Sequence, residues 1–208
     1  MPNSNTILLG GFCLGSLKYF DTDEREFQTR VNTADMQVHV RDLAQKYLKM
    51  HGSHNVAQLN YRTGEDPMQA FWRTLVGDCK VYPTERLTPE DVSHDQSIFQ
   101  LVVSSDGKPR NIYQLRSLAM LEKLQSTLWR FGITTNGLFV LAQHDAAEGD
   151  VIVVLDGAKT PMVLRPKTVD LHGNVLYQPI SGAYVHGFMD GEVLNMQEEF
   201  DEQVFWVI

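Results

Sequence analysis

A histidine and two carboxylates lie within seven residues near the end of the chain, in the stretch Tyr184–Glu192, which reads Tyr-Val-His-Gly-Phe-Met-Asp-Gly-Glu. If its first half is an extended strand, Tyr184 and His186 share one face, because side chains alternate along a strand. Asp190 and Glu192 follow across an expected Asp-Gly turn. A histidine beside carboxylates can act as a general base whose orientation the acid fixes. The candidate catalytic residues are therefore His186, Asp190 and Glu192.

The same residues also allow a structural interpretation. His186 can be a core or rim histidine whose hydrogen bonds are satisfied, Asp190 can form a turn, and Glu192 can pair with an arginine. The sequence leaves both interpretations open.

Arginine and aromatic side chains are the candidate substrate contacts. Arg165 follows the apolar run Pro161–Leu164, and inside a barrel it could bind a carboxylate or an enolate. Its alternative role is a bidentate ion pair with Glu192 or Asp190. The full set of expected substrate-binding residues is Arg165, Tyr184, Arg130 and Trp129.

Other chemistry has little support in the sequence. Cys79 is a weak candidate nucleophile, because no base is paired with it by spacing. The two cysteines, Cys13 and Cys79, show no metal-ligand spacing. The chain has no glycine-rich dinucleotide fingerprint, Walker loop, His-Glu-x-x-His or Gly-x-Ser-x-Gly motif. We therefore expect no metal and no cofactor.

Short apolar runs separated by turn signals predict the strands that would carry these residues. A glycine-interrupted run over Ile7–Tyr19 predicts one or two strands. From residue 128 to 208 the period is two, apart from 193–203. Asn136-Gly137 predicts a tight hairpin of type I′, in which both residues have positive φ. Glu148–Asp150 is expected to be an exposed turn.

Between these β regions, residues 35–126 have a mainly helical pattern. Asp66 before Pro67 predicts a helix start that presents Phe71 and Leu75 to a core. Residues 83–95 are expected to form a polar loop, and residues 110–128 an amphipathic helix.

These elements predict an α+β fold: a small, mostly antiparallel β-barrel with helices inserted between its N-terminal and C-terminal strands. We expect one domain over residues 1–208, with first strands in 1–20, the helical insertion in 35–126, and a β-meander in 128–208. The content of 43% hydrophobic and 21% charged residues is that of an ordinary folded domain.

The net charge of −8 argues against nucleic acid as a partner, because a phosphate backbone would be repelled. No apolar run reaches the roughly 18 residues that a spanning helix needs. The start of the chain lacks the pattern of a secretory signal. We therefore expect a cytoplasmic protein without a membrane or nucleic-acid partner.

Several motifs in order resemble the C-terminal barrel region of fungal heterokaryon-incompatibility proteins of the Het-6 type. They are the aromatic-rich helix Phe71–Leu75, the hairpin Thr135–Leu138, Gly149-Asp150 before a β-branched run, the strand Pro161–Arg165 and the closing stretch Tyr184–Glu192. The resemblance extends from Ala70 to Leu194 and, more weakly, over Ile7–Tyr19. It implies a barrel fold. In that family an N-terminal effector domain precedes the barrel, and we expect this chain to lack it, so cell-death activity is not carried over.

Two functions fit the sequence. The first is a small-molecule barrel that acts as a cofactor-independent isomerase, lyase or cyclase in fungal secondary metabolism, by acid–base or conformational catalysis on a metabolite. The second is a non-catalytic recognition or regulatory module that binds a protein partner, or a second copy, in self/non-self signalling. A deep pocket with ionisable groups would favour the enzyme, and a filled barrel would favour the recognition module.

Overall fold

The computed structural model of the chain describes residues 6–21, 42, 61–80, 85–93, 129–196 and 198–208. The chain divides into two compact units, which we call the β unit (residues 1–22 and 129–208) and the insertion unit (residues 23–128). The helix expected over 110–128, and much of the helical pattern over 35–126, lie outside the described residues. The single domain over 1–208 stays a prediction.

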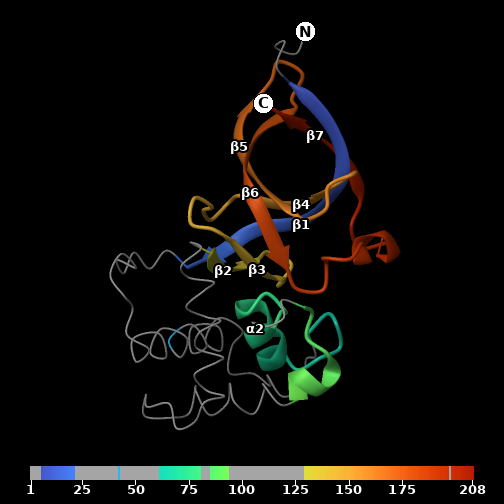
Figure 1. Ribbon diagram of the computed structural model, residues 1–208. Helices are drawn as coiled ribbons and strands as arrows, with labels where there is room; N and C mark the ends of the chain where they lie inside the picture. Colours follow the sequence, from blue (N-terminus) through green and yellow to red (C-terminus); the bar gives the residue numbers. More distant parts are fainter. Residues whose placement is uncertain (1–5, 22–41, 43–60, 81–84, 94–128, 197) are drawn as a thin grey trace. The chain divides into compact units, whose positions relative to one another are not determined.

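Seven strands form one sheet in the β unit (Figure 1). They are β1 (Ile7–Phe20), β2 (Trp129–Thr134), β3 (Phe139–Gln143), β4 (Val151–Leu155), β5 (Met162–Val169), β6 (Val175–Val185) and β7 (Glu202–Val207). A short 3₁₀ helix, η2 (Glu192–Asn195), precedes β7. The described strand pairs are antiparallel except β6 and β7, which run parallel, so the sheet is mixed.

The strand pairings close on themselves in two rings that share four strands. β1, β4, β5, β6 and β7 form the first ring. In the second ring, β2 and β3 take the place of β7, because β2 pairs with the end of β1 and β3 with the end of β6. The long strands β1 and β6 therefore belong to both rings, as Figure 1 shows. The predicted pairing of the N-terminal strand with the C-terminal half of the chain is confirmed.

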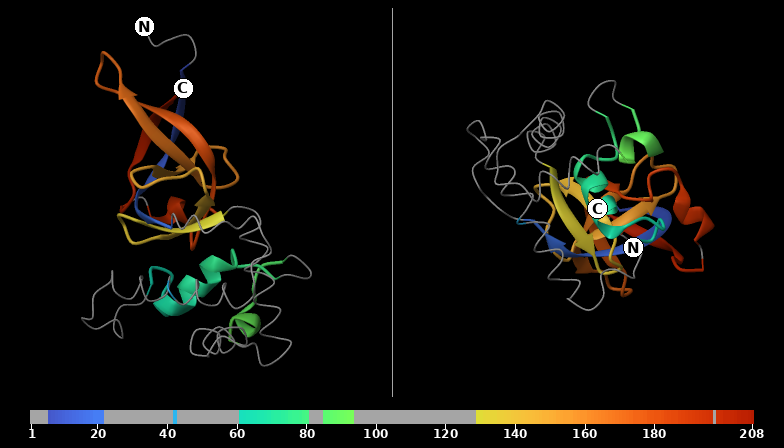
Figure 2. Two further views of the ribbon diagram at one scale, coloured as in Figure 1. Left: turned by 90° about the vertical axis from the view of Figure 1, so that its left-hand side faces the viewer. Right: turned by 90° about the horizontal axis from the view of Figure 1, so that it is seen from below.

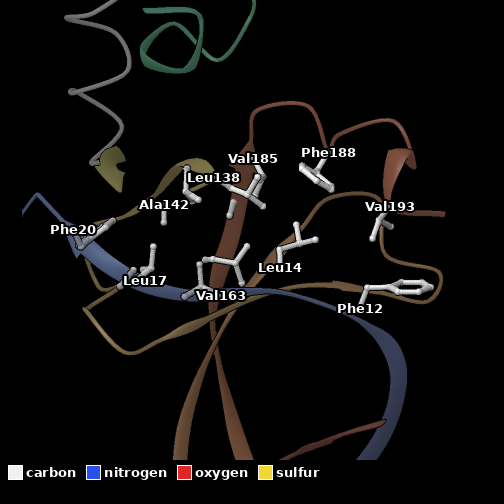
Figure 3. Packing of buried hydrophobic residues seen from close by; sticks show 14 of the residues in the cluster. Phe12, Leu14, Leu17, Phe20, Leu138, Ala142, Val163, Val185, Phe188 and Val193 are labelled. Carbon is white, nitrogen blue, oxygen red and sulfur yellow. The ribbon is translucent and has the colours of Figure 1, made fainter. Parts of the chain in front are cut away.

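Each ring has its own hydrophobic core. Alternation places Ile152 and Val163 in one core, and their neighbours Val153 and Leu164 in the other, so β4 and β5 form a wall between the two. The larger core includes Leu14, Leu17, Val140, Ala183 and Val185 (Figure 3). Phe188, Val193 and Phe200, from the segment around η2, belong to the same core, and the Phe188 and Phe200 rings meet edge-on at 5.5 Å. The smaller core contains Val153, Leu155, Leu164, Phe205 and Val207.

The Asn136-Gly137 turn joins β2 to β3 and also docks on β1. The hairpin is confirmed, but Gly137 alone of the two has positive φ, at 77°. The bond from Gly137 N–H to the Thr134 carbonyl, 2.9 Å long, fits an ordinary turn with a left-handed glycine rather than a type I′ turn. Asn136 Nδ2 donates to the Leu14 carbonyl at 3.2 Å. This contact lies beside a bulge in β1 at Gly15, whose φ of 111° requires glycine.

In the described part of the insertion unit, two short helical segments lie between β1 and β2 in the sequence. α2 (Pro67–Leu75) begins as predicted, because the Asp66 side chain accepts bonds from the Met68 and Gln69 amides and Pro67 occupies the first turn. Its residues Phe71, Trp72 and Leu75 are buried.

The polar loop expected over 83–95 is partly wrong, because residues 89–93 are helical. Thr88 and Asp91 exchange reciprocal side-chain to backbone bonds at its start, which is a capping box. Pro89 follows the cap at the first helical position.

The β5–β6 hairpin turns at residues 170–174. The side chain of Asp170 accepts bonds from the backbone amides of His172 and Asn174, at 2.8 and 2.9 Å. The beginning of β1, the end of β7 and this turn lie at the same end of the β unit (Figure 2). This arrangement brings the exposed apolar side chains of three strands close to one another.

Candidate functional site

His186 is buried at the end of β6. It is 3% exposed, its Nδ1 lies 2.8 Å from the Tyr184 hydroxyl, and its backbone N–H donates to the Phe139 carbonyl at 3.0 Å. Tyr184 alternates with Ala183 and Val185, which point into the larger core, and it pairs with Leu141. Tyr184 therefore lies on the face of the sheet that points away from that core, and His186, directly after the strand, is hydrogen bonded to it.

Asp190 and Glu192 form a turn. The Glu192 side chain accepts a 2.7 Å bond from the Asp190 backbone N–H, and between them Gly191 takes a left-handed conformation before η2 begins. The Glu192 carboxylate thus accepts a backbone N–H directly before a helical turn, much as a capping residue does. Asp190 lies in a turn, as its structural interpretation expected, but this contact of Glu192 is to a backbone amide and not to an arginine.

Arg165 binds Asp150, a residue that the sequence analysis did not select. Its Nε and Nη2 donate to the two carboxylate oxygens of Asp150 at 2.8 Å each, and Nη2 also donates to the Asp145 carbonyl at 2.7 Å. A bidentate pair was expected, but the partner was not Glu192 or Asp190. The reason is the register: β4 begins beside Asp150, and Val151 pairs with Leu164, next to Arg165.

Asp150 was expected in an exposed turn, but it is 2% exposed. Its carboxylate also accepts the backbone N–H of Ala147 at 2.8 Å, and its backbone carbonyl accepts the Leu17 N–H. The pair therefore fastens the β3–β4 connection to β5 and β1. The hydrogen bonds to Asp150 raise the pKa of Arg165, so the guanidinium stays charged. The sequence signal that could have identified this ion pair is an aspartate directly before one strand and an arginine within the next strand.

Trp129 and Arg130 open β2, and both are half-buried. Arg130 donates from Nη1 to the Trp129 carbonyl at 3.1 Å. Arg130 pairs in register with Ala142, and Trp129 with Gln143. Neither Trp129 nor Arg130 belongs to the smaller core.

A cluster of packed side chains lies inside each ring. In the first ring, Phe205 meets Tyr177 edge-on, with ring centroids 5.8 Å apart, and Leu9, Cys13 and Met162 pack against the same cluster. Burial raises the pKa of the Tyr177 phenol. The larger core is built from aliphatic and phenylalanine side chains. The chemistry-bearing residues predicted from sequence are not members of either cluster.

A hollow of about 310 Å³ lies in the insertion unit, lined by Gln69, Arg73, Leu87, Pro89, Val92 and Ser93. Arg73 is already held by Glu65 and Asp78, each at 2.8 Å. Burial opposes the charge on Arg73, but its hydrogen bonds to Asp78 and Glu65 outweigh burial and raise its pKa. Its donors are thus largely engaged in holding the α2 region together.

Cys79, next to Asp78, is a poor nucleophile. Burial raises the pKa of its thiol, and Asp78 raises it further against an opposing effect of Arg86. Among the described residues, no group of three or more histidine, cysteine or carboxylate side chains could hold a metal ion. No helix in the described part of the chain is both long and apolar enough to cross a membrane.

Most of the β unit matches a known domain family. Residues 115–207 match the Het-6 beta-barrel domain. The resemblance predicted from sequence is confirmed over this span, which contains β2 to β7. The Het-6 match does not include β1 or α2, although β1 completes both rings. No curated protein matches the chain, and no solved structure matches it either.

Proposed function

We propose that the β unit is a closed Het-6-type barrel that recognises a protein partner. The observation that supports this most directly is the filling of both rings by apolar side chains such as Leu164, Phe205 and Val185. A catalytic or ligand pocket needs an open volume into which a few polar groups converge. A ring with a packed interior has its outer surface available for binding.

The roles of the candidate residues support the same proposal. Arg165 holds a loop through Asp150, and the Glu192 side chain completes a turn. His186 is buried and hydrogen bonded with Tyr184. A contact within the fold for each of these side chains supports a structural role, although the partners of Arg165 and Glu192 differ from those expected from the sequence.

Acid–base turnover of a small metabolite is the second candidate function. The hollow beside Arg73 favours it, because Gln69 and Ser93 add polar groups to its lining. Under this alternative the chain is a cofactor-independent isomerase, lyase or cyclase. His186, Asp190 and Glu192 are not among the residues that line this hollow, and their catalytic roles stay predictions.

Two screens on the full chain separate these functions. Thermal denaturation with a library of small metabolites reports small-molecule binding, because a ligand that binds the folded state raises Tm. Selection from a random dodecapeptide display library reports recognition of protein segments. Recognition predicts enriched peptides and no metabolite that raises Tm. A metabolite that raises Tm and is converted to product would overturn the proposal.

A further inference from the structure

We propose that the outer face of β7 is the recognition surface, and that it takes a partner segment with an apolar anchor next to lysine or arginine. This inference rests on the proposed recognition function. The surface, which we call the β7 face, consists of Leu8, Leu176, Val204, Trp206 and Ile208.

The register places these residues together. Leu8 of β1 pairs with Trp206 on one side of β7, and Leu176 of β6 pairs with Trp206 on the other. Paired residues project to the same face of a sheet, and alternation adds Val204 and Ile208 to that face. Phe205 and Val207, between them, point into the smaller core. The β7 face is thus a continuous apolar row across three strands.

The side chains of this face are accessible. Val204 is 55% exposed, Leu8 51% and Ile208 47%, and Trp206 and Leu176 are partly exposed. A large apolar side chain left in water costs free energy that a partner can recover by covering it. Tryptophan is also among the residues that contribute most to binding at interfaces.

Two carboxylates, those of Asp156 and Glu202, lie at one end of the β7 face, and their negative charge favours a positively charged partner. Gly10 pairs with Val204, and a Cβ built on Gly10 would collide with the Asp156 carboxylate and meet Glu202 Oε1 at 3.8 Å. Among the described residues, neither Asp156 nor Glu202 has an ion-pair partner. A cation placed over Gly10 would be within reach of both.

This arrangement favours a basic segment over a second copy of the chain. Each copy carries a net charge of −8, so two copies repel one another at long range, whereas a basic segment is attracted. The Gly10 end of the face then fixes the direction of the segment, with its lysine or arginine at Asp156 and Glu202 and its apolar anchor at Trp206.

The test uses peptides selected on the full chain from a random dodecapeptide library. Peptides with an aromatic or aliphatic residue beside lysine or arginine should be enriched. Val204→Asp should weaken their binding at least tenfold by fluorescence anisotropy. Leu194→Asp is the matched control, because Leu194 is 60% exposed but lies on η2, and it should leave affinity unchanged. Unchanged melting midpoints would show that both variants fold.

Charge reversal gives a second, independent readout. Glu202→Lys should weaken a peptide that carries lysine and strengthen the same peptide with glutamate in its place. If the enriched peptides bind Val204→Asp and the wild type with equal affinity, the β7 face is not the binding surface, but the proposed recognition function is retained. If no such peptides are enriched, or sedimentation shows a dimer that Val204→Asp dissociates, the basic partner segment is refuted. A metabolite that the chain converts to product would instead refute the recognition function itself.

Discussion

Phe205 and Val204 are neighbours on β7 that face opposite sides, and they test whether the first ring has a packed interior. Phe205 is 1% exposed and contacts Tyr177, whereas Val204 is 55% exposed. Replacing a buried phenylalanine by alanine removes its burial and leaves a cavity, which costs about 3–5 kcal/mol. Replacing an exposed strand valine should cost no more than about 1 kcal/mol.

The difference is large enough to measure by thermal denaturation. In a chain of this size, 1 kcal/mol shifts Tm by about 2–4 °C. Phe205→Ala should therefore lower Tm by about 6–20 °C, and Val204→Ala by no more than about 4 °C. Far-UV circular dichroism follows the loss of the strands, and guanidinium unfolding gives an independent free energy. Equal effects of the two substitutions would refute the packed interior.

Four further substitutions or measurements test other contacts. Arg165→Met should lower stability by about 1–3 kcal/mol, because it leaves buried Asp150 without its cation, and a Tm equal to that of the wild type would show that the pair is dispensable. Phe71→Ala should cost about 3–5 kcal/mol in guanidinium unfolding, since Phe71 is fully buried, and no change would show that α2 is peripheral. His186→Ala should lower Tm and leave peptide binding intact in the folded fraction, whereas lost binding at unchanged Tm would place His186 in the binding site. Cys79 should react with iodoacetamide more slowly than glutathione does at pH 8, because the pKa of its thiol is raised and the thiolate is the reactive form. Its rate should increase as the pH rises above the ordinary thiol pKa. Mass spectrometry at Cys79 measures the rate, and a rate equal to that of glutathione would contradict the burial of this thiol.

Local signals in the sequence were sufficient for the strands and for the start of α2. The apolar runs Val151–Leu155 and Val204–Ile208, and the Asp66-Pro67 cap, are each signalled by neighbouring residues in the chain. The pairing of the two ends of the chain also followed from sequence, because an apolar strand at a chain end needs a partner. The parallel pairing of β6 with β7 could not be predicted, because it depends on how the rings close.

The candidate site was predicted less well than the fold. His186, Asp190 and Glu192 were grouped because they are close in the sequence, and Arg165 was added as the expected charge partner of the two acids, but its ion pair is with Asp150. Strand register decides such partners, and here the pairing of Val151 with Leu164 places Asp150 beside Arg165. The β7 face was missed for a related reason: its apolar residues come from three strands, and their outward direction follows from which neighbours fill the smaller core.

Methyl NMR of the full chain tests most directly whether binding occurs on the outer surface or inside the rings. The methyl groups of Leu8 and Val204 report the β7 face, and those of Val153 and Leu164 report the smaller core. We predict that a selected basic peptide shifts the Leu8 and Val204 signals and that no small metabolite shifts the Val153 and Leu164 signals. A metabolite that shifts Val153 and Leu164 while Leu8 and Val204 stay unchanged would contradict the account.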